Sequence, residues 1–155
     1  MEEQYQKTLD YLRKLCSVRE YCRKDIYDKA LKRLEDDTAA SKAVEQLIRE
    51  GFLSESRYAA AYARDKSSIA GWGPAKIRYM LAGKGIPRGV IDEALQEIDA
   101  GRAGDKLRKL LVAKYKLLKD DPQVKIKMLK FALSRGYEYD AVGSIVKEIL
   151  RNEEI

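Results

Sequence analysis

The side chains best suited to chemistry in this sequence are the lysines and arginines of its last third. Residues 102–135 hold eleven basic and three acidic side chains. If this segment begins as a helix, four basic residues share one face: Arg102, Lys106, Lys109 and Lys116. The opposite face is apolar and consists of Leu107, Leu111, Tyr115 and Leu118. A cationic stripe on an amphipathic helix attracts phosphates without regard to base sequence, so the pattern indicates nucleic-acid binding.

Further basic residues extend this prediction, although they cannot all point the same way. The next expected helix carries Lys125, Lys127 and Lys130, and the middle of the chain adds Arg57, Arg64, Lys76 and Arg78. The alternative is a solvated face that serves solubility only. The net charge is zero over residues 1–51, +1 over 52–100 and +5 over 101–155. This asymmetry favours a binding surface centred on the last third of the chain.

The sequence offers no set of residues for catalysis. It contains no histidine, the commonest general base, and its two cysteines, Cys16 and Cys22, are too few for a zinc site. The carboxylate pairs Asp36-Asp37 and Asp120-Asp121 fall in expected turns, where they cap helices. Gly71-Trp72-Gly73-Pro74 follows a helix rather than a strand, unlike a phosphate-binding loop. We therefore expect no enzymatic activity, no metal and no cofactor.

Length and composition fit one domain or a short array of small modules. The chain has 155 residues, of which 45% are apolar and 36% are charged. No apolar run is long enough to cross a bilayer, and the first residues lack the basic and apolar regions of a secretory signal. These features predict a cytoplasmic protein that does not bind membranes.

Apolar residues at helical spacing, punctuated by glycine and proline, predict a chain that is helical throughout. Gly51 and Gly85 are placed to end helices, whereas Pro74 and Pro87 are placed to begin them. Nine helices in three groups result. The first group spans 9–18, 23–34 and 39–50, the second 55–69, 74–84 and 87–98, and the third 102–119, 122–135 and 141–150.

The three groups look like a repeat with a period of 51 residues. Gly85 and Gly136 are 51 residues apart, as are Ile26, Ile77 and Met128 in turn. Leu34 departs from the pattern, because a glycine is expected there. We predict an all-α tandem array of three three-helix repeats, at residues 1–51, 52–100 and 101–155, that is an elongated, curved monomer. An ordinary helical bundle with accidental self-similarity is the alternative.

Four short motifs follow one another in the first two groups: Arg19-Glu20-Tyr21, Arg57-Tyr58-Ala59, Gly71-Trp72-Gly73-Pro74 and Lys84-Gly85-Ile86. Their order and spacing resemble the RecX family, bacterial regulators of the recombinase RecA. The sequence departs from the family pattern at Cys22, where a capping serine is usual, and at Ser54-Glu55, where two acidic residues are usual. The third group is similar to the family only in outline.

The resemblance implies three tandem three-helix repeats without enzymatic activity. It also implies binding to the RecA–DNA filament and suppression of its ATPase, strand-exchange and coprotease functions in recombination, DNA repair and the SOS response. The implied partners are the RecA filament and DNA, single- or double-stranded, without sequence specificity. The alternative function is general nucleic-acid binding by a helical protein through its basic third repeat.

The array interpretation makes a prediction about size in solution. A compact domain of this length has a radius of gyration of about 15 Å. We expect small-angle X-ray scattering to give a clearly larger radius, because each repeat of an array contacts only its neighbours. A radius of about 15 Å would instead support the single bundle.

Overall fold

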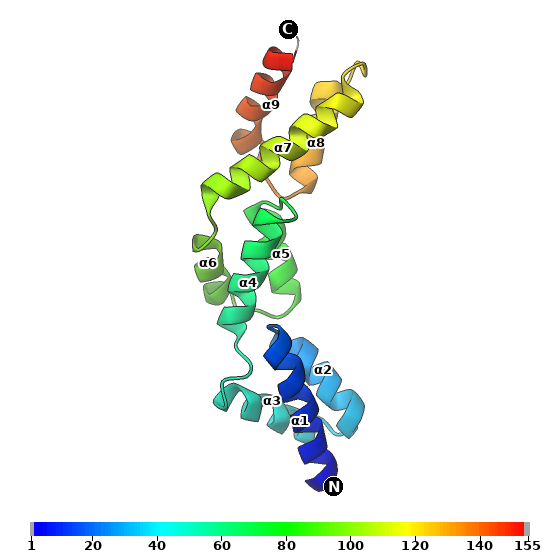
Figure 1. Cartoon of the computed structure of the whole chain (residues 1–155), viewed down its shortest axis with the longest axis vertical. Coiled ribbons are helices and arrows are strands. Elements are labelled where there is room, and N and C mark those ends of the chain that lie inside the picture. Colours follow the sequence, from blue (N-terminus) through cyan, green and yellow to red (C-terminus); the bar gives the residue numbers. More distant parts are fainter. Residues whose placement is uncertain (1, 154–155) are drawn as a thin grey trace. The chain divides into compact units, whose positions relative to one another are not determined.

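The protein is all-α over residues 2–153, the part that its computed structural model describes (Figure 1). Nine helices and no strands lie within this range, as the sequence predicts. The helices are α1 (Glu2–Val18), α2 (Arg23–Leu34), α3 (Asp37–Arg49), α4 (Glu55–Ser68), α5 (Pro74–Gly83), α6 (Arg88–Gln96), α7 (Ala100–Leu118), α8 (Val124–Ser134) and α9 (Tyr139–Glu153).

Three helices, α2, α4 and α5, begin where the sequence predicts, and the other six begin one to seven residues away. Helix α1 starts seven residues earlier than expected, because Tyr5 buries its ring and donates a hydrogen bond of 2.9 Å from its hydroxyl to Gln46 Oε1. Helix α8 starts at Val124 rather than at residue 122. The Asp121 carboxylate accepts a 2.8 Å hydrogen bond from the backbone N–H of Gln123 and so holds a turn before the helix.

The described chain packs as two compact units. The first unit contains residues up to 61 and residues 81–94, and the second contains residues 62–80 and 95 onward. Helices α4, α5 and α6 therefore each contribute residues to both units. The boundaries of the three sequence repeats remain a prediction, and their outermost residues, 1 and 154–155, lie outside the described part.

Each unit has its own apolar core. In the first unit, α1, α2 and α3 bury one face each. The buried residues are Tyr5, Leu9, Leu12, Tyr21, Ile26, Ala30, Ala40, Ala43, Val44, Leu47 and Leu53. In the second unit, α7, α8 and α9 do the same. Their buried residues are Leu107, Leu111, Tyr115, Met128, Ala132, Val142, Val146 and Ile149.

The 51-residue period recurs in the backbone where the middle helices end. Gly85 and Gly136 both have positive φ, at 78° and 93°. The residue after each glycine donates its N–H to a carbonyl five residues earlier, at 3.2 Å after Gly85 and 3.3 Å after Gly136. In the first group the left-handed position is one residue later than expected, at Glu35 (φ 54°) rather than at Leu34. The turn is therefore retained although the glycine is not.

A close backbone contact joins α5 to the end of α8 in the second unit. The N–H of Gly73 donates to the carbonyl of Arg135 at 2.6 Å, and the N–H of Ala75 donates to the carbonyl of Gly136 at 3.2 Å. A Cβ at Gly73 would overlap the Gly136 carbonyl, and one at Gly136 would overlap Lys76. Only glycine at both positions permits this contact.

The Gly73–Gly136 contact predicts a large loss of stability on adding a methyl group. Gly136→Ala should lower the free energy of unfolding by about 2–4 kcal/mol, since it adds left-handed strain and a backbone overlap. Gly104→Ala is the matched control. No atom lies within 4 Å of its Cβ position, so this helical substitution should be neutral or stabilise by about 0.5–1 kcal/mol. Urea unfolding followed by circular dichroism measures both; equal midpoints would contradict the structural role of Gly136.

Candidate nucleic-acid interface

Helix α7 carries the predicted cationic face, which we call the α7 stripe: Arg102, Lys106, Lys109 and Lys116. The helix begins at a capped N-terminus, where the Asp99 carboxylate accepts a 3.0 Å hydrogen bond from the backbone N–H of Arg102. Its apolar face is anchored by Leu107, Leu111 and Tyr115, which are buried as predicted. Three stripe residues are therefore exposed, and Lys106 is half-buried at the edge.

A second group of cations lies between α7 and α8, in a shallow hollow of about 300 Å³ that we call the α7–α8 groove. Its lining residues are Lys114, Leu118, Lys127, Lys130 and Phe131. Lys127 and Lys130 are among the binding residues that the sequence predicts, and the structure places them together. Lys125, the third predicted lysine of α8, is exposed and does not line the groove.

Phe131 organises the cationic groups around this groove. The Lys114 ammonium lies 5.3 Å from the centroid of the Phe131 ring, and the Arg135 guanidinium carbon lies 5.1 Å from it. Both distances fall within the range of cation–π attraction. The ring therefore restricts Lys114, whose side chain would otherwise be free to rotate.

Asp121 is the acidic neighbour of the groove. Its carboxylate lies 2.5 Å from the Lys127 ammonium, and this contact, helped by the backbone N–H of Gln123, lowers the pKa of Asp121. Both side chains are partly exposed to solvent. The pair is therefore of the kind that contributes little to stability, but it does place a competing anion beside a groove lysine.

The predicted residues of the middle repeat divide between the two units. Arg57 lies in the first unit, where its guanidinium pairs with Glu20 at 3.0 Å and donates to the carbonyl of Gly51 at 2.8 Å. These interactions give Arg57 a structural role. Arg64 and Arg78 are exposed on the part of the chain that belongs to the second unit.

Lys76, the remaining predicted residue, belongs to an aromatic cluster in the second unit. Its ammonium lies 4.4 Å from the Trp72 ring centroid, and that of Lys66 lies 4.7 Å from the same ring. Tyr62 meets Trp72 edge-on, with ring centroids 6.3 Å apart. The half-buried Trp72 thus packs within the unit, with cations at its ring.

Two residues with clear roles are not predicted from the sequence. Lys114 lies at the border of the apolar face of α7, where a long side chain can reach the neighbouring helix. Glu55 accepts a 2.8 Å hydrogen bond from the backbone N–H of Arg23 and so caps α2 from a distant part of the chain. Burial raises the pKa of Glu55, although its bond with Arg23 opposes the shift. The position of Lys114 at the border of the apolar face is the one feature that sequence spacing could have revealed. The Glu55–Arg23 hydrogen bond joins distant parts of the chain and leaves no such pattern.

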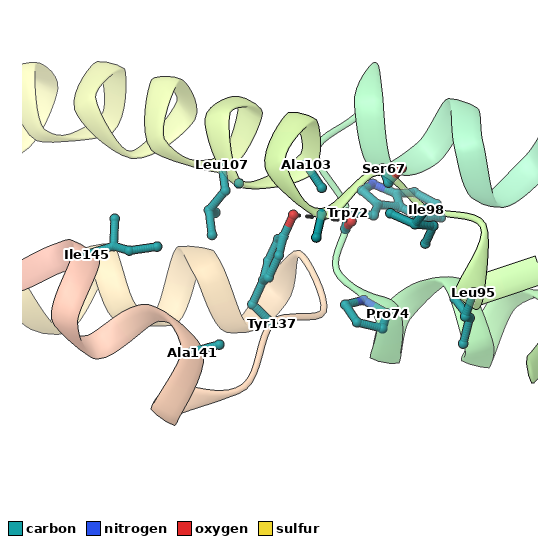
Figure 2. A pocket seen from close by; sticks show the side chains of 12 residues that line it. Ser67, Trp72, Pro74, Leu95, Ile98, Ala103, Leu107, Tyr137, Ala141 and Ile145 are labelled. Carbon is teal, nitrogen blue, oxygen red and sulfur yellow. Dashed lines mark hydrogen bonds between the residues drawn. The ribbon is translucent and has the colours of Figure 1, made fainter.

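The second unit also contains an apolar cavity of about 400 Å³. Figure 2 shows the side chains that line it. Trp72, Ile98, Leu107, Tyr137 and Ile145 are among its walls. The Tyr137 hydroxyl donates to the carbonyl of Trp72 at 3.3 Å, and burial raises the pKa of Tyr137. No side chain that lines the cavity is charged at neutral pH.

Residues 2–153 show neither a metal site nor a membrane span. They contain no group of three or more cysteine or carboxylate side chains placed to hold a metal ion. Within the same range, every helix is too short or too polar to cross a bilayer.

Comparison with known proteins identifies the family of this chain. The sequence model of the second three-helix domain of RecX matches residues 54–95. A protein of Pseudomonas putida W619 named "Regulatory protein RecX" is 32% identical over 133 residues, which cover 85% of this chain and 84% of the relative. The chain belongs to the RecX family. A Clostridium perfringens strain 13 relative of the same name is 35% identical, and this chain spans 62% of its length.

Solved RecX structures have the same fold. The crystal structure of RecX from Lactobacillus salivarius aligns with a TM-score of 0.78, covering 96% of this chain and 98% of that one at 20% identity. A second structure, described as regulatory protein RecX, gives a TM-score of 0.79 and covers 96% of this chain and 72% of that one at 22% identity. The all-α arrangement of helical repeats is thus the fold of the RecX family.

The α7 stripe generates a prediction for DNA binding. Reversing Lys106, Lys109 and Lys116 to Glu should weaken binding to all sequences alike and flatten the log–log salt dependence by about 0.7–0.9 for each phosphate that is no longer neutralised. Reversal of the exposed Lys14, Lys24 and Lys32 of the first unit makes the same change in net charge and should have a smaller effect. Fluorescence anisotropy over a range of salt concentrations measures both. An unchanged affinity and slope in the stripe variant would mean that the stripe is only a solvated face.

Proposed function

We propose that this chain regulates the RecA recombinase by binding the RecA–DNA filament and lowering its ATPase, strand-exchange and coprotease activities. The observation that carries the proposal is the similarity to proteins named "Regulatory protein RecX", at 32% identity over 84% of one such relative. The protein acts by binding, not by catalysis, in the cytoplasm and as a monomer. Its partners are the recombinase and DNA, in recombination and DNA repair.

The cationic surfaces of the second unit support the DNA part of this proposal. The exposed ammonium and guanidinium groups of α7 and α8 attract phosphates through charge alone, so the interaction does not depend on base sequence. Arg64, Lys76 and Arg78 are the better candidates for contacting the recombinase, since the motifs that resemble the family lie around them. Arg57 is a weaker candidate, because its guanidinium already pairs with Glu20 and donates to the carbonyl of Gly51.

General nucleic-acid binding through the basic third repeat is the second candidate function. The concentration of charge in residues 101–155, at net +5, favours it. The two functions differ in what limits inhibition. A filament regulator acts at concentrations too low to cover the DNA, whereas a general binder inhibits only by covering it.

The test is therefore the rate of DNA-dependent ATP hydrolysis by RecA as the chain is added. We expect inhibition at concentrations well below those that saturate the same DNA in the absence of RecA. The variant with Glu in place of Lys106, Lys109 and Lys116 serves as the comparison, since it separates loss of DNA binding from loss of inhibition. Inhibition that only follows coating of the DNA would favour the second candidate. Intrinsic ATPase or nuclease activity that copurifies through several columns would contradict a purely binding role.

A further inference from the structure

We propose that the α7–α8 groove binds a phosphodiester of a nucleic-acid strand, and that Asp121 occupies one groove lysine until the phosphate displaces it. This inference rests on the DNA binding in the proposed function and deepens it. It assigns a binding role to Lys114 and a competing role to Asp121, neither of which belongs to the α7 stripe.

The lining of the groove favours an anionic ligand. Three of its five lining side chains are lysines, and the other two, Leu118 and Phe131, are apolar. An ammonium group has three N–H donors and no acceptor. The lining side chains therefore supply only donors, and the ligand must supply the acceptors. The volume of about 300 Å³ is at the lower end of ligand sites, which suits one backbone phosphate with its sugar.

The surroundings of the groove remain positive when its acidic neighbours are counted. Residues 114–130 contain six lysines and two aspartates, Asp120 and Asp121, which gives a net charge of +4. A strand that passes over the groove therefore meets a field that attracts each of its phosphates.

The position of Phe131 favours contact with the backbone of the strand rather than with its bases. Lys114 and Arg135 already lie at the ring, at 5.3 and 5.1 Å from its centroid, and the ring is half-buried. The cation–π interaction also holds Lys114 near the groove before a ligand arrives. Less side-chain entropy is then lost on binding.

In the free protein, the Asp121 carboxylate occupies a position expected for a ligand oxygen. Its carboxylate is 2.5 Å from the Lys127 ammonium, in the role that a phosphate oxygen would take. Exposed ion pairs of this kind are weak, so a phosphodiester that also contacts Lys114 and Lys130 can replace the carboxylate. The turn does not depend on the charge of Asp121, because an amide oxygen can equally accept the 2.8 Å hydrogen bond from Gln123.

The test measures binding of the whole chain to a labelled oligothymidylate of about 15 nucleotides, by fluorescence anisotropy over a range of salt concentrations. Lys114→Gln should weaken binding about 3–10-fold and reduce the log–log salt slope by about 0.7. Asp121→Asn should tighten binding about 2–5-fold, because it frees Lys127. A misfolded variant would not gain affinity, so the second result cannot come from damage to the fold.

Two matched controls remove the effect of net charge. Lys147→Gln makes the same change as Lys114→Gln at an exposed position on α9, and Asp120→Asn makes the same change as Asp121→Asn one residue away. In the described part of the chain, Asp120 forms no ion pair with a groove lysine. Both controls should stay within about twofold of the parent protein.

Several outcomes would overturn the inference. Equal losses in Lys114→Gln and Lys147→Gln, or equal gains in Asp121→Asn and Asp120→Asn, would reduce the effect to net charge. An effect of Lys114→Gln that persists with an uncharged methylphosphonate oligonucleotide would assign the groove to bases. The same measurements are made with a duplex of equal length. The probe, single strand or duplex, whose binding Lys114→Gln weakens more is the preferred ligand of the groove. A chain that binds neither probe would refute the groove, while the RecA ATPase assay still decides the filament proposal.

Discussion

A helix that begins inside a packed unit leaves backbone N–H groups that need acceptors, and each one left unpaired costs about 1–3 kcal/mol. In the second unit, the acceptors for the start of α5 are backbone carbonyls at the end of α8. The N–H groups of Gly73 and Ala75 reach the carbonyls of Arg135 and Gly136 at 2.6 and 3.2 Å. The partly negative end of α8 thus lies at the partly positive end of α5, a favourable arrangement of dipoles. The Arg135 guanidinium also donates to the carbonyl of Ala70 at 3.1 Å, which adds a second hydrogen bond between the end of α8 and the segment before α5.

The first unit meets the same need with side chains. The N–H of Arg23, the first residue of α2, donates to the Glu55 carboxylate, and Asp25 pairs with Lys84 at 3.3 Å. The corresponding helix of the second unit begins with Pro74, which has no N–H and therefore needs no carboxylate. Arg23 and Pro74, which are 51 residues apart, thus solve the problem of the first helical N–H in different ways. The buried positions keep the period more faithfully, since Ala30, Leu81 and Ala132 are all fully buried.

The sequence predicts the helices well because their ends are local events, marked by glycine, proline and capping aspartates. It predicts the α7 stripe for the same reason, since a helical period alone places those residues on one face. It does not predict the start of α1, because the burial of Tyr5 depends on Gln46, which is 41 residues away. The sequence does not predict the groove either, because whether Lys114 faces Phe131 depends on how α7 and α8 are rotated against each other. That rotation is set by core packing, so no spacing within one helix could reveal it.

The placement of cations on more than one side of α7 bears on the kind of ligand that the second unit can hold. Lys109 and Lys116 lie on the solvent side of the helix, whereas Lys114 lies at the groove. An exposed lysine–phosphate interaction is worth little alone, so useful affinity requires several at once. A free nucleotide cannot supply phosphates to both surfaces, but a strand of several nucleotides can. Asp121 strengthens this preference, because a ligand with one weak interaction does not displace its carboxylate from Lys127. The charge pattern therefore favours a polymer over a small phosphate.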